Sequence, residues 1–324
     1  MLKLNRRAVV ALGLAAALGS TAPVFAQSDY PNKPITLVVS YAAGGGTDAI
    51  ARLFAARLEQ ALGGRVIVEN RPGAAANIGT EVVAEAEPDG YTLLIGNQGP
   101  MVVNPHLFEL PADPAEALDP IAMIADASLV VVVGPKQPVA TLGELVETAK
   151  TGQLVYGSAG NASASHLASV LFGQTAGVDI RHVPYQGAGP AVNDLVGGHI
   201  DFMITTIPSV IGLVQDSTLK ALAVTGSERF TQLPDVPTAQ EAGVEGYTAS
   251  AWYGLLGPKG LPEDVRQRLA DATAEVLADP AFLEKLANDG GVPSTLVGAD
   301  FAAYMVQERA RWGEVVAAAE ISVE

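Results

Sequence analysis

The sequence contains no cysteine. A chain without thiols can form no disulfide, offers no thiolate to a metal or a substrate, and has no cysteine for an N-terminal lipid. Basic residues are also scarce, because 19 Lys and Arg stand against 35 Asp and Glu, for a net charge of −16. That excess disfavours nucleic acid and anionic membrane surfaces as partners. It also disfavours long-range attraction of an anionic small molecule, so local groups must hold any anion.

Histidine is also scarce, with only four residues. The four histidines, His106, His166, His182 and His199, show neither H-x-x-x-H nor H-E-x-x-H spacing. Such spacings place two ligands on one helix face, and without them a metal site is not predicted. We expect His182 and His199 to be structural and His166 alone to lie near a ligand.

The first residues have the pattern of an export signal. Lys3, Arg6 and Arg7 precede an apolar run over 8–18, and Val24-Phe25-Ala26 supplies small residues at a cleavage spacing. A membrane anchor is the alternative, but the run is shorter than the roughly 20 residues that span a bilayer. The arginine pair fits a twin-arginine signal or an ordinary positive segment. We expect a signal peptide over 1–26, whose three positive charges leave a mature chain of charge −19.

Two segments of similar plan follow each other. Strand-like apolar runs alternate with helical spacing, which predicts parallel sheets in an α/β fold. The expected strands are 35–39, 66–68 and 91–95 in the first segment, then 154–156, 180–183 and 201–204 in the second, with further runs at 129–133 and 252–256. Helices over 263–277 and 301–319 are expected to return to the first lobe. Ligands bind outside the carboxyl ends of strands in such sheets, which places the loops GGGTD and GSAGNASAS at one cleft.

The stretch SYAAGGGTDAIARLF joins the first strand to a helix through three glycines. Glycine lets backbone N–H groups approach a ligand closely, and the helix N-terminus favours negative charge. The loop therefore has the pattern of an anion site. Asp48, in the first helical turn, serves either the ligand or the helix dipole, and Tyr41 and Tyr185 stand at strand ends that would face the cleft.

Two catalytic alternatives fit parts of these loops. Gly44-x-Gly46-x-x-Ala49, with Glu69 after the next strand, matches the dinucleotide fingerprint and would make the protein an exported nicotinamide-dependent oxidoreductase. Nicotinamide cofactors are scarce outside the cytoplasm, which counts against it. A serine hydrolase is weaker, because Gly157-Ser158-Ala159-Gly160 is not G-x-S-x-G and the loop serines equally suit helix capping.

The loops together resemble a known family. KPITLVVSYAAGGGTDAIAR, VENRPGAAANIG, PDGYTLLIGN, YGSAGNASASHLA, HVPYQGAGPA, GGHIDFM, LPDVPTAQEAG and WYGLLGPKGLP occur in that order. The chain resembles the substrate-binding proteins of tripartite tricarboxylate transporters, the Bug or TctC-like family, over nearly its whole mature length. The resemblance implies a two-lobed periplasmic-binding-protein clamshell of the type II kind. It implies a periplasmic protein that binds a small di- or tricarboxylate or related acid for a two-subunit membrane permease, with no catalysis and no cofactor. We expect a monomer.

The resemblance also implies a ligand site built from both lobes. Carried onto this sequence, the site residues are Tyr41, Ala43, Gly45, Gly46, Thr47, Asp48, Ser158, Asn161, Ser163 and His166, with Tyr185, Gly187 and Thr205 as weaker candidates. The expected lobes are 27–125 with 250–324, and 126–249, with hinges near 125–128 and 226–250.

Three positions depart from the family pattern. Gly46 stands where a serine is common, Ala75-Ala76 replace glycines, and Gln186 often appears as a basic residue. The first leaves Thr47 to supply the hydroxyl, and the last puts a second strong anion contact in doubt.

Overall fold

The computed structural model describes residues 30–318. The chain divides into two units, Met1–Tyr30 and Pro31–Glu324, and every helix and strand given below lies in the second. The predicted signal peptide falls outside the described residues. None of the helices in the described part is both long and apolar enough to cross a membrane.

The first lobe is built on three parallel strands. Val38 of the central strand pairs with Glu69 on one side and Leu94 on the other, and the central strand is apolar except for Thr36, as expected of a parallel strand covered on both faces. Its elements are β1 (Ile35–Val39), α2 (Gly46–Leu62), β2 (Val66–Asn70), α3 (Asn77–Ala84) and β3 (Thr92–Asn97). The parallel sheet predicted from the alternation of strands and helices is confirmed here.

The second lobe repeats this plan. Strand β5 pairs in parallel with β6 and β7, and helix α6 packs on β7. Its elements are α5 (Leu142–Thr151), β5 (Leu154–Ser158), α6 (Ala164–Ala176), β6 (Ile180–Pro184), α7 (Ala188–Gly197), β7 (Phe202–Thr206), α8 (Ile211–Gln215) and β8 (Lys220–Val224). Gly177 and Gly198 end two of these helices in the left-handed conformation that favours glycine.

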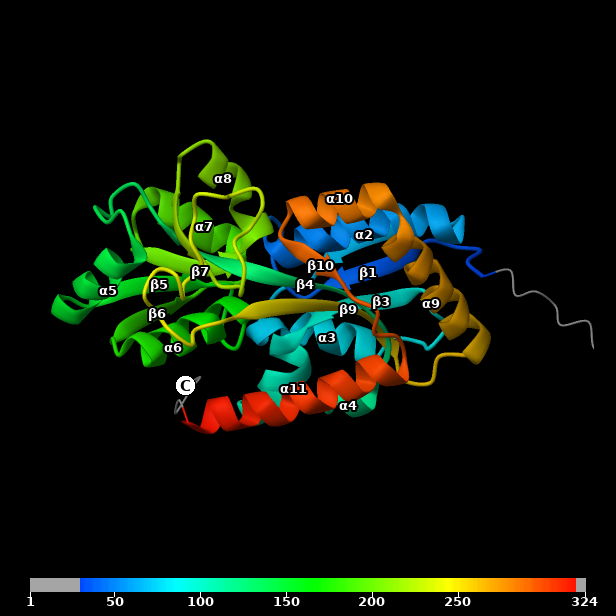
Figure 1. Cartoon of the computed structure of the whole chain (residues 1–324). Coiled ribbons are helices and arrows are strands. Elements are labelled where there is room, and N and C mark those ends of the chain that lie inside the picture. Colours follow the sequence, from blue (N-terminus) through cyan, green and yellow to red (C-terminus); the bar gives the residue numbers. More distant parts are fainter. Residues whose placement is uncertain (1–29, 319–324) are drawn as a thin grey trace, which may run out of the picture. The chain divides into compact units, whose positions relative to one another are not determined.

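Strands β4 (Leu118–Val133) and β9 (Ser250–Pro258) run between the lobes (Figure 1). Residues 118–128 of β4 pair with β9, and from Leu129 onward β4 pairs with β7 and β8 instead. The sheet order is therefore β2-β1-β3-β9-β4-β7-β5-β6. The sequence predicted only the last five residues of β4, because the earlier part contains Pro120 and Asp126, residue types that are rare in strands. Two register shifts beside Pro120 and Met123 keep that part paired.

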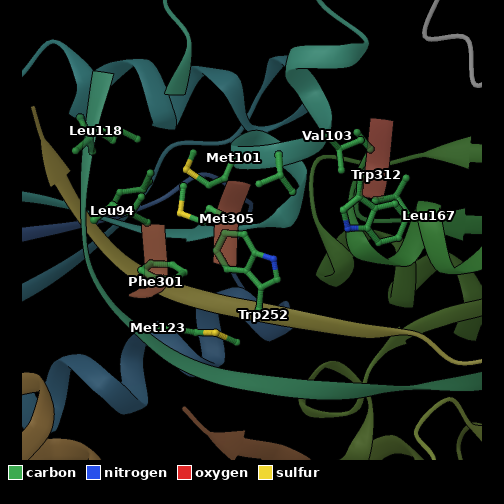
Figure 2. Close-up of a cluster of buried hydrophobic side chains, with 14 of the residues drawn as sticks. Leu94, Met101, Val103, Leu118, Met123, Leu167, Trp252, Phe301, Met305 and Trp312 are labelled. Carbon is green, nitrogen blue, oxygen red and sulfur yellow. The ribbon is translucent and has the colours of Figure 1, made fainter. Parts of the chain in front are cut away.

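The C-terminal helices pack against elements of the first lobe. Helices α9 (Glu263–Ala278) and α10 (Pro280–Asn288) contact α2, with the rings of Phe54 and Phe282 edge to face at 6.4 Å. Helix α11 (Ala299–Ala318) contacts β4, and Phe301 meets Trp252 of β9 at 5.6 Å (Figure 2). Each buried aromatic ring of this size adds about 1.5–3 kcal/mol by burial. The remaining short elements are η1 (Ala74–Ala76), the π-helical turn η2 (Gly99–Val103), η3 (Asn104–His106), α4 (Pro114–Ala117), η4 (Ile207–Ser209) and β10 (Gly291–Pro293).

Candidate functional site

The glycine loop leads from β1 into α2. Only Gly44 has a positive φ, at +86°, whereas Gly45 is extended with φ −94° and caps α2 without a side-chain acceptor. The first-turn N–H groups of a helix have no partner within it, so those of α2 are open to other groups. One of them is taken across the cleft, because the Gly46 N–H donates to Ser209 Oγ of the second lobe at 2.8 Å.

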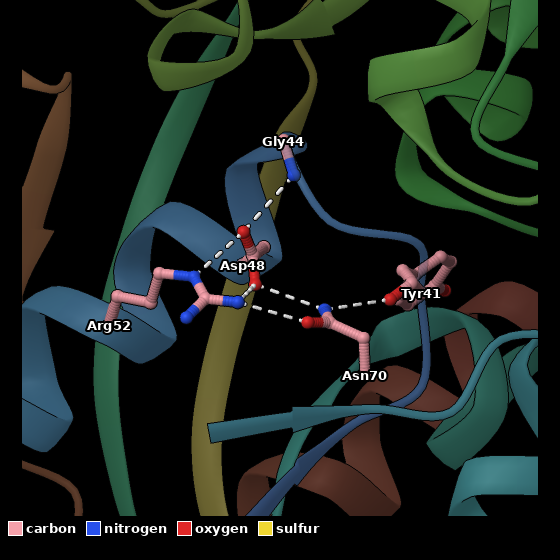
Figure 3. Close-up of polar contacts among 5 residues, drawn as sticks. All are labelled: Tyr41, Gly44, Asp48, Arg52 and Asn70. Carbon is pink, nitrogen blue, oxygen red and sulfur yellow. Dashed lines mark hydrogen bonds and ion pairs between the residues drawn. The ribbon is translucent and has the colours of Figure 1, made fainter. Parts of the chain in front are cut away.

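Asp48 stabilises the conformation of this loop through hydrogen bonds (Figure 3). Its carboxylate accepts from the Gly44 N–H at 3.0 Å, from Arg52 Nε at 3.1 Å and from Asn70 Nδ2 at 3.0 Å. Asn70 Nδ2 also donates to the carbonyl of Tyr41 at 3.0 Å. Burial favours the protonated carboxyl, but the hydrogen bonds from Arg52, Gly44 and Asn70 outweigh it and lower the pKa of Asp48. The charge of Asp48 is thus satisfied by the protein itself.

The second glycine-serine loop precedes α6. Ser163 is the N-cap, accepting from the His166 N–H at 3.3 Å and donating to the Gly160 carbonyl at 2.6 Å. Ser165 Oγ accepts from the Ala159 N–H at 2.8 Å. Ser158 is fully buried and its hydroxyl lies 2.6 Å from His182 Nε2. Capping and loop hydrogen bonding, which the sequence left open as roles for these serines, are therefore observed.

A stack of rings supports the same loop. The rings of His166 and His182 lie parallel with centroids 4.1 Å apart, and Tyr156 stacks on His182 at 4.9 Å. His166 Nδ1 accepts from the N–H of Ala162, a residue with φ +58°. Burial lowers the pKa of His166 to about 4, and burial together with His166 lowers that of His182 to about 3. Both rings are neutral at pH 7, and His166 holds the loop in shape.

A small chamber lies between the two loops. Its volume is about 30 Å³, more than the roughly 10–15 Å³ that one water needs, so it can admit a small polar group such as the head group of a ligand. Its walls come from both lobes and from β9, and they carry hydroxyls, an amide and backbone but no charged side chain. They consist of Tyr41, Gly45, Gly46, Thr47, Asn97, Ala159, Ser163, Ala164, Ser165, Ala188, Thr205, Thr206, Ala251 and Tyr253.

The N-termini of α2 and α6 both reach this chamber, through Gly46 and Thr47 on one side and Ala164 and Ser165 on the other. Helix N-termini carry partial positive charge and unpaired N–H groups. In a closed, poorly hydrated space these act strongly on a nearby anion. The arrangement can therefore hold an anionic head group without a cationic side chain.

A larger pocket of about 310 Å³ adjoins the chamber. Tyr41 and Ala159 line both spaces, so the two pockets are neighbours. The rest of the outer pocket is formed by Ser40, Gly73, Ala74, Ala75, Ala76, Phe108, Gly160, Asn161, Pro184, Tyr185 and Gln186. Pockets for small ligands are typically about 300–1,000 Å³, so this one is large enough for the body of a small acid.

The structure brings together part of the predicted site. Tyr41, Gly45, Gly46, Thr47, Ser163 and Thr205 line the chamber, and Asn161 and Tyr185 line the outer pocket. Ala43, Asp48, Ser158, His166 and Gly187 line neither. A Cβ on Gly187, whose φ is +155°, would lie 3.0 Å from the backbone nitrogen of Ala42, so this glycine permits close contact between the lobes.

Several chamber residues went unrecognised in the sequence. Asn97 accepts from Tyr41 OH at 3.2 Å and donates to Thr47 Oγ1 at 3.4 Å. It ends β3, so the rule that ligands bind at carboxyl ends of strands could have indicated it. Thr206 ends β7, so the same rule could have indicated it. Tyr253 gave no such signal, because it lies within an apolar run that reads as core.

The oxidoreductase alternative finds no support. The carboxylate of Glu69 forms an ion pair with Arg71, and the chamber at the glycine loop is far smaller than a dinucleotide. A Cβ on Gly45 would lie 3.3 Å from Ala188, so the second lobe occupies the space that a pyrophosphate would need.

Comparison with known proteins gives consistent matches. The family model described as "Tripartite tricarboxylate transporter family receptor" matches residues 50–321. Protein BugT of Bordetella pertussis is 36% identical over 313 residues, covering 95% of each chain. The periplasmic binding protein BugD has 34% identity and a TM-score of 0.86, over 90% of this chain and 99% of that one. R. palustris Rpa4515, solved with adipate, has 33% identity and a TM-score of 0.87, over 91% and 99%. The predicted fold class, a two-lobed periplasmic-binding-protein clamshell, is confirmed.

Proposed function

The chain belongs to the tripartite tricarboxylate transporter family of receptors, and from this premise we propose that it captures a small organic acid in the periplasm for a two-subunit membrane permease. Members of the family are solute-binding receptors and not enzymes. We propose further that the mature protein begins near Gln27 and acts as a monomer. The adipate found in a structural relative supports a carboxylate as the ligand class.

The observation that carries this proposal is the construction of the chamber. Two helix N-termini and the hydroxyls of Thr47, Thr205 and Tyr253 surround a space that suits one carboxylate. The net charge of −16 repels anions at a distance, so short-range groups of this kind are the ones that can select a carboxylate. No side chain in the chamber walls is a nucleophile paired with a base, which agrees with binding alone.

We propose that binding closes the two lobes, 27–125 with 250–324 and 126–249, about hinges near 125–128 and 226–250. The change of partners along β4 at Ser128 supports a hinge there, because the pairing on either side belongs to different lobes. Two hydrogen bonds across the cleft favour the closed state: Gly46 N–H to Ser209 Oγ, and Ala42 N–H to the Gln186 carbonyl at 2.9 Å. Small-angle scattering should therefore show that the protein becomes more compact when an acid that it binds is added. An unchanged profile at saturation contradicts the hinge.

Thr205→Val tests the chamber directly. Thr205 is buried, lines the chamber and is not the N-cap of a helix. Valine therefore removes its hydroxyl and keeps the shape of the side chain. Losing one hydrogen bond to a charged group costs about 1.5–3 kcal/mol, so calorimetric titration should show the acid bound roughly 10- to 150-fold more weakly.

Thr273→Val in α9 is the matched control, since that buried hydroxyl bonds only within its helix, to the Leu269 carbonyl at 2.8 Å. It should leave the dissociation constant unchanged. Equal dissociation constants for the unmodified protein and Thr205→Val would refute the assignment of the chamber.

A further inference from the structure

We infer that Ser209 is a positioning residue for ligand binding, because it joins the N-terminus of α2 to the hydroxyl of Thr206 in a hydrogen-bond chain that a carboxylate in the chamber completes. The inference rests on the proposed function and adds to it a residue that lines neither the chamber nor the outer pocket. It follows from the direction in which each hydrogen bond of this chain can be donated.

Ser209 provides the acceptor that the N-cap of α2 lacks. Gly45, the N-cap, has no side chain, and the N–H of Gly46 in the first turn donates to Ser209 Oγ at 2.8 Å. A serine hydroxyl is a common acceptor at a helix N-terminus, where it usually belongs to the N-cap itself. Here it belongs to η4 of the opposite lobe, 163 residues away in the sequence. The hydrogen bond therefore exists only while the two lobes are in contact.

The hydroxyl of Ser209 is also linked to the chamber. Ser209 Oγ and Thr206 Oγ1 lie 2.9 Å apart, and either atom can donate. Thr206 is buried and lines the chamber, as does Tyr253. Burial raises the pKa of Tyr253, and a hydrogen bond with Thr206 opposes that shift. The hydrogen-bond chain thus reaches the chamber at two hydroxyls, those of Thr206 and Tyr253.

A carboxylate in the chamber would set the direction of this hydrogen-bond chain. The Gly46 N–H can only donate, so Ser209 Oγ accepts at that end. A carboxylate can only accept, so Thr206 or Tyr253 donates at the other end. Each hydroxyl has one proton, and every group is satisfied when Ser209 donates to Thr206 and Thr206 donates onward, to the carboxylate or to Tyr253.

The aligned hydrogen bonds link the charge of the ligand to the contact between the lobes. Hydrogen bonds that run in one direction polarise one another, and a charged acceptor at the end makes the strongest of them. The bond between Gly46 and Ser209 should therefore strengthen when an anion occupies the chamber. Affinity for a carboxylate should depend on Ser209, although Ser209 does not line the space that holds the ligand.

Ser209→Ala tests this inference by calorimetric titration. The probe is whichever of succinate, malate, adipate and benzoate raises the melting temperature of the unmodified protein most. We expect Ser209→Ala to raise the dissociation constant of that acid about 3- to 10-fold. Ser294→Ala is the matched control, because the half-buried hydroxyl of Ser294 also accepts one backbone N–H, that of Leu296 at 3.1 Å, but within the first lobe. It should leave the dissociation constant unchanged.

A double-mutant cycle with Thr206→Val distinguishes a hydrogen-bond chain from an isolated contact. Valine keeps the shape of Thr206 and ends the hydrogen-bond chain at Ser209. Ser209→Ala should therefore weaken binding by a factor at least about twofold smaller in the Thr206→Val background than in the unmodified protein. Equal factors in the two backgrounds would mean that Ser209 acts only as a contact between the lobes, and they overturn the inference.

The outcomes separate this inference from the proposed function. If an acid binds and Ser209→Ala behaves like Ser294→Ala, the inference fails while the carboxylate site stands. If none of the four acids binds to the unmodified protein, the carboxylate chamber itself is contradicted, and the proposed function fails together with the inference.

Discussion

Replacing Gly46 by alanine should block closure of the lobes without harming the fold. Gly46 is the first residue of α2, where alanine is the better helix former by up to about 1 kcal/mol. A Cβ at this position would, however, lie 2.1 Å from Thr206 Oγ1, 3.0 Å from Thr206 Cβ and 3.2 Å from Tyr253 OH. Thr206 belongs to the second lobe, so its overlap arises only when the lobes meet, whereas Tyr253 belongs to β9 of the first lobe and contributes only the looser 3.2 Å contact of its hydroxyl.

The size of the effect follows from that geometry. An overlap of this extent in a packed contact costs about 1–3 kcal/mol once neighbours shift. Since the overlap with Thr206 is confined to the closed state, it reduces the population that can bind, and the apparent dissociation constant should rise about 5- to 150-fold. The melting temperature without ligand should stay the same or rise slightly.

Titration calorimetry and thermal melts of matched variants check this prediction. Gly143→Ala, in the first turn of α5, is the control, because its new Cβ would meet nothing closer than Thr141 Oγ1 at 4.0 Å. Thr206→Ala removes the clashing hydroxyl, so Gly46→Ala should weaken binding less when it is made in the Thr206→Ala background than when it is made in the unmodified protein. Unchanged affinity in Gly46→Ala, or a melting temperature below that of Gly143→Ala, would refute the reasoning.

Two further predictions concern pH. His166 and His182 stay neutral in the fold, with pKa values of about 4 and 3, while the unfolded chain takes up protons below about 6.5. Unfolding should therefore become easier as pH falls from 6.5 toward 4, by up to about 1.4 kcal/mol per pH unit for each histidine. His182→Gln should flatten that dependence in thermal melts, and an identical slope would contradict the assignment. Burial raises the pKa of Asp126 from 3.8 to about 6, so the free energy of unfolding falls as pH rises from about 3.8 to 6 and stays lower above it. Asp126→Asn should therefore raise the melting temperature at pH 7 but not at pH 4.

The glycine loop illustrates how far a local pattern reaches. The sequence indicated that its glycines leave the backbone bare for a ligand. In the structure the lack of a side chain at Gly45 and Gly46 also lets Ala188 and Thr206 of the second lobe come close to them. Only Gly44 needs glycine for its positive φ. The same residues thus serve both the contact between the lobes and the access of a ligand to the backbone. The sequence of this one segment indicated only the access of a ligand.

Asp48 and His166 show the same limit. Both stand in the first turns of helices that reach the chamber, which made them candidates for ligand contact. Asp48 accepts a hydrogen bond from Asn70, 22 residues away, and His166 accepts one from Ala162 and stacks on His182, so ligand contact by either residue stays a prediction. Side-chain direction depends on partners that the fold supplies, and two of them, Asn70 on β2 and His182 on β6, come from other strands.

The sequence by itself determined the order of strands and helices, the parallel pairing within each lobe, and the placement of both glycine loops at strand ends. These features follow from local periodicity and from turn residues, which act over a few neighbours. Only the tertiary structure decided which side chains enclose the chamber. Thr206 and Tyr253 reach it because β4 changes partners at Ser128 and aligns β9 with one lobe and β7 with the other. That alignment is set by hydrogen bonds between strands more than a hundred residues apart in places, and no local pattern encodes it.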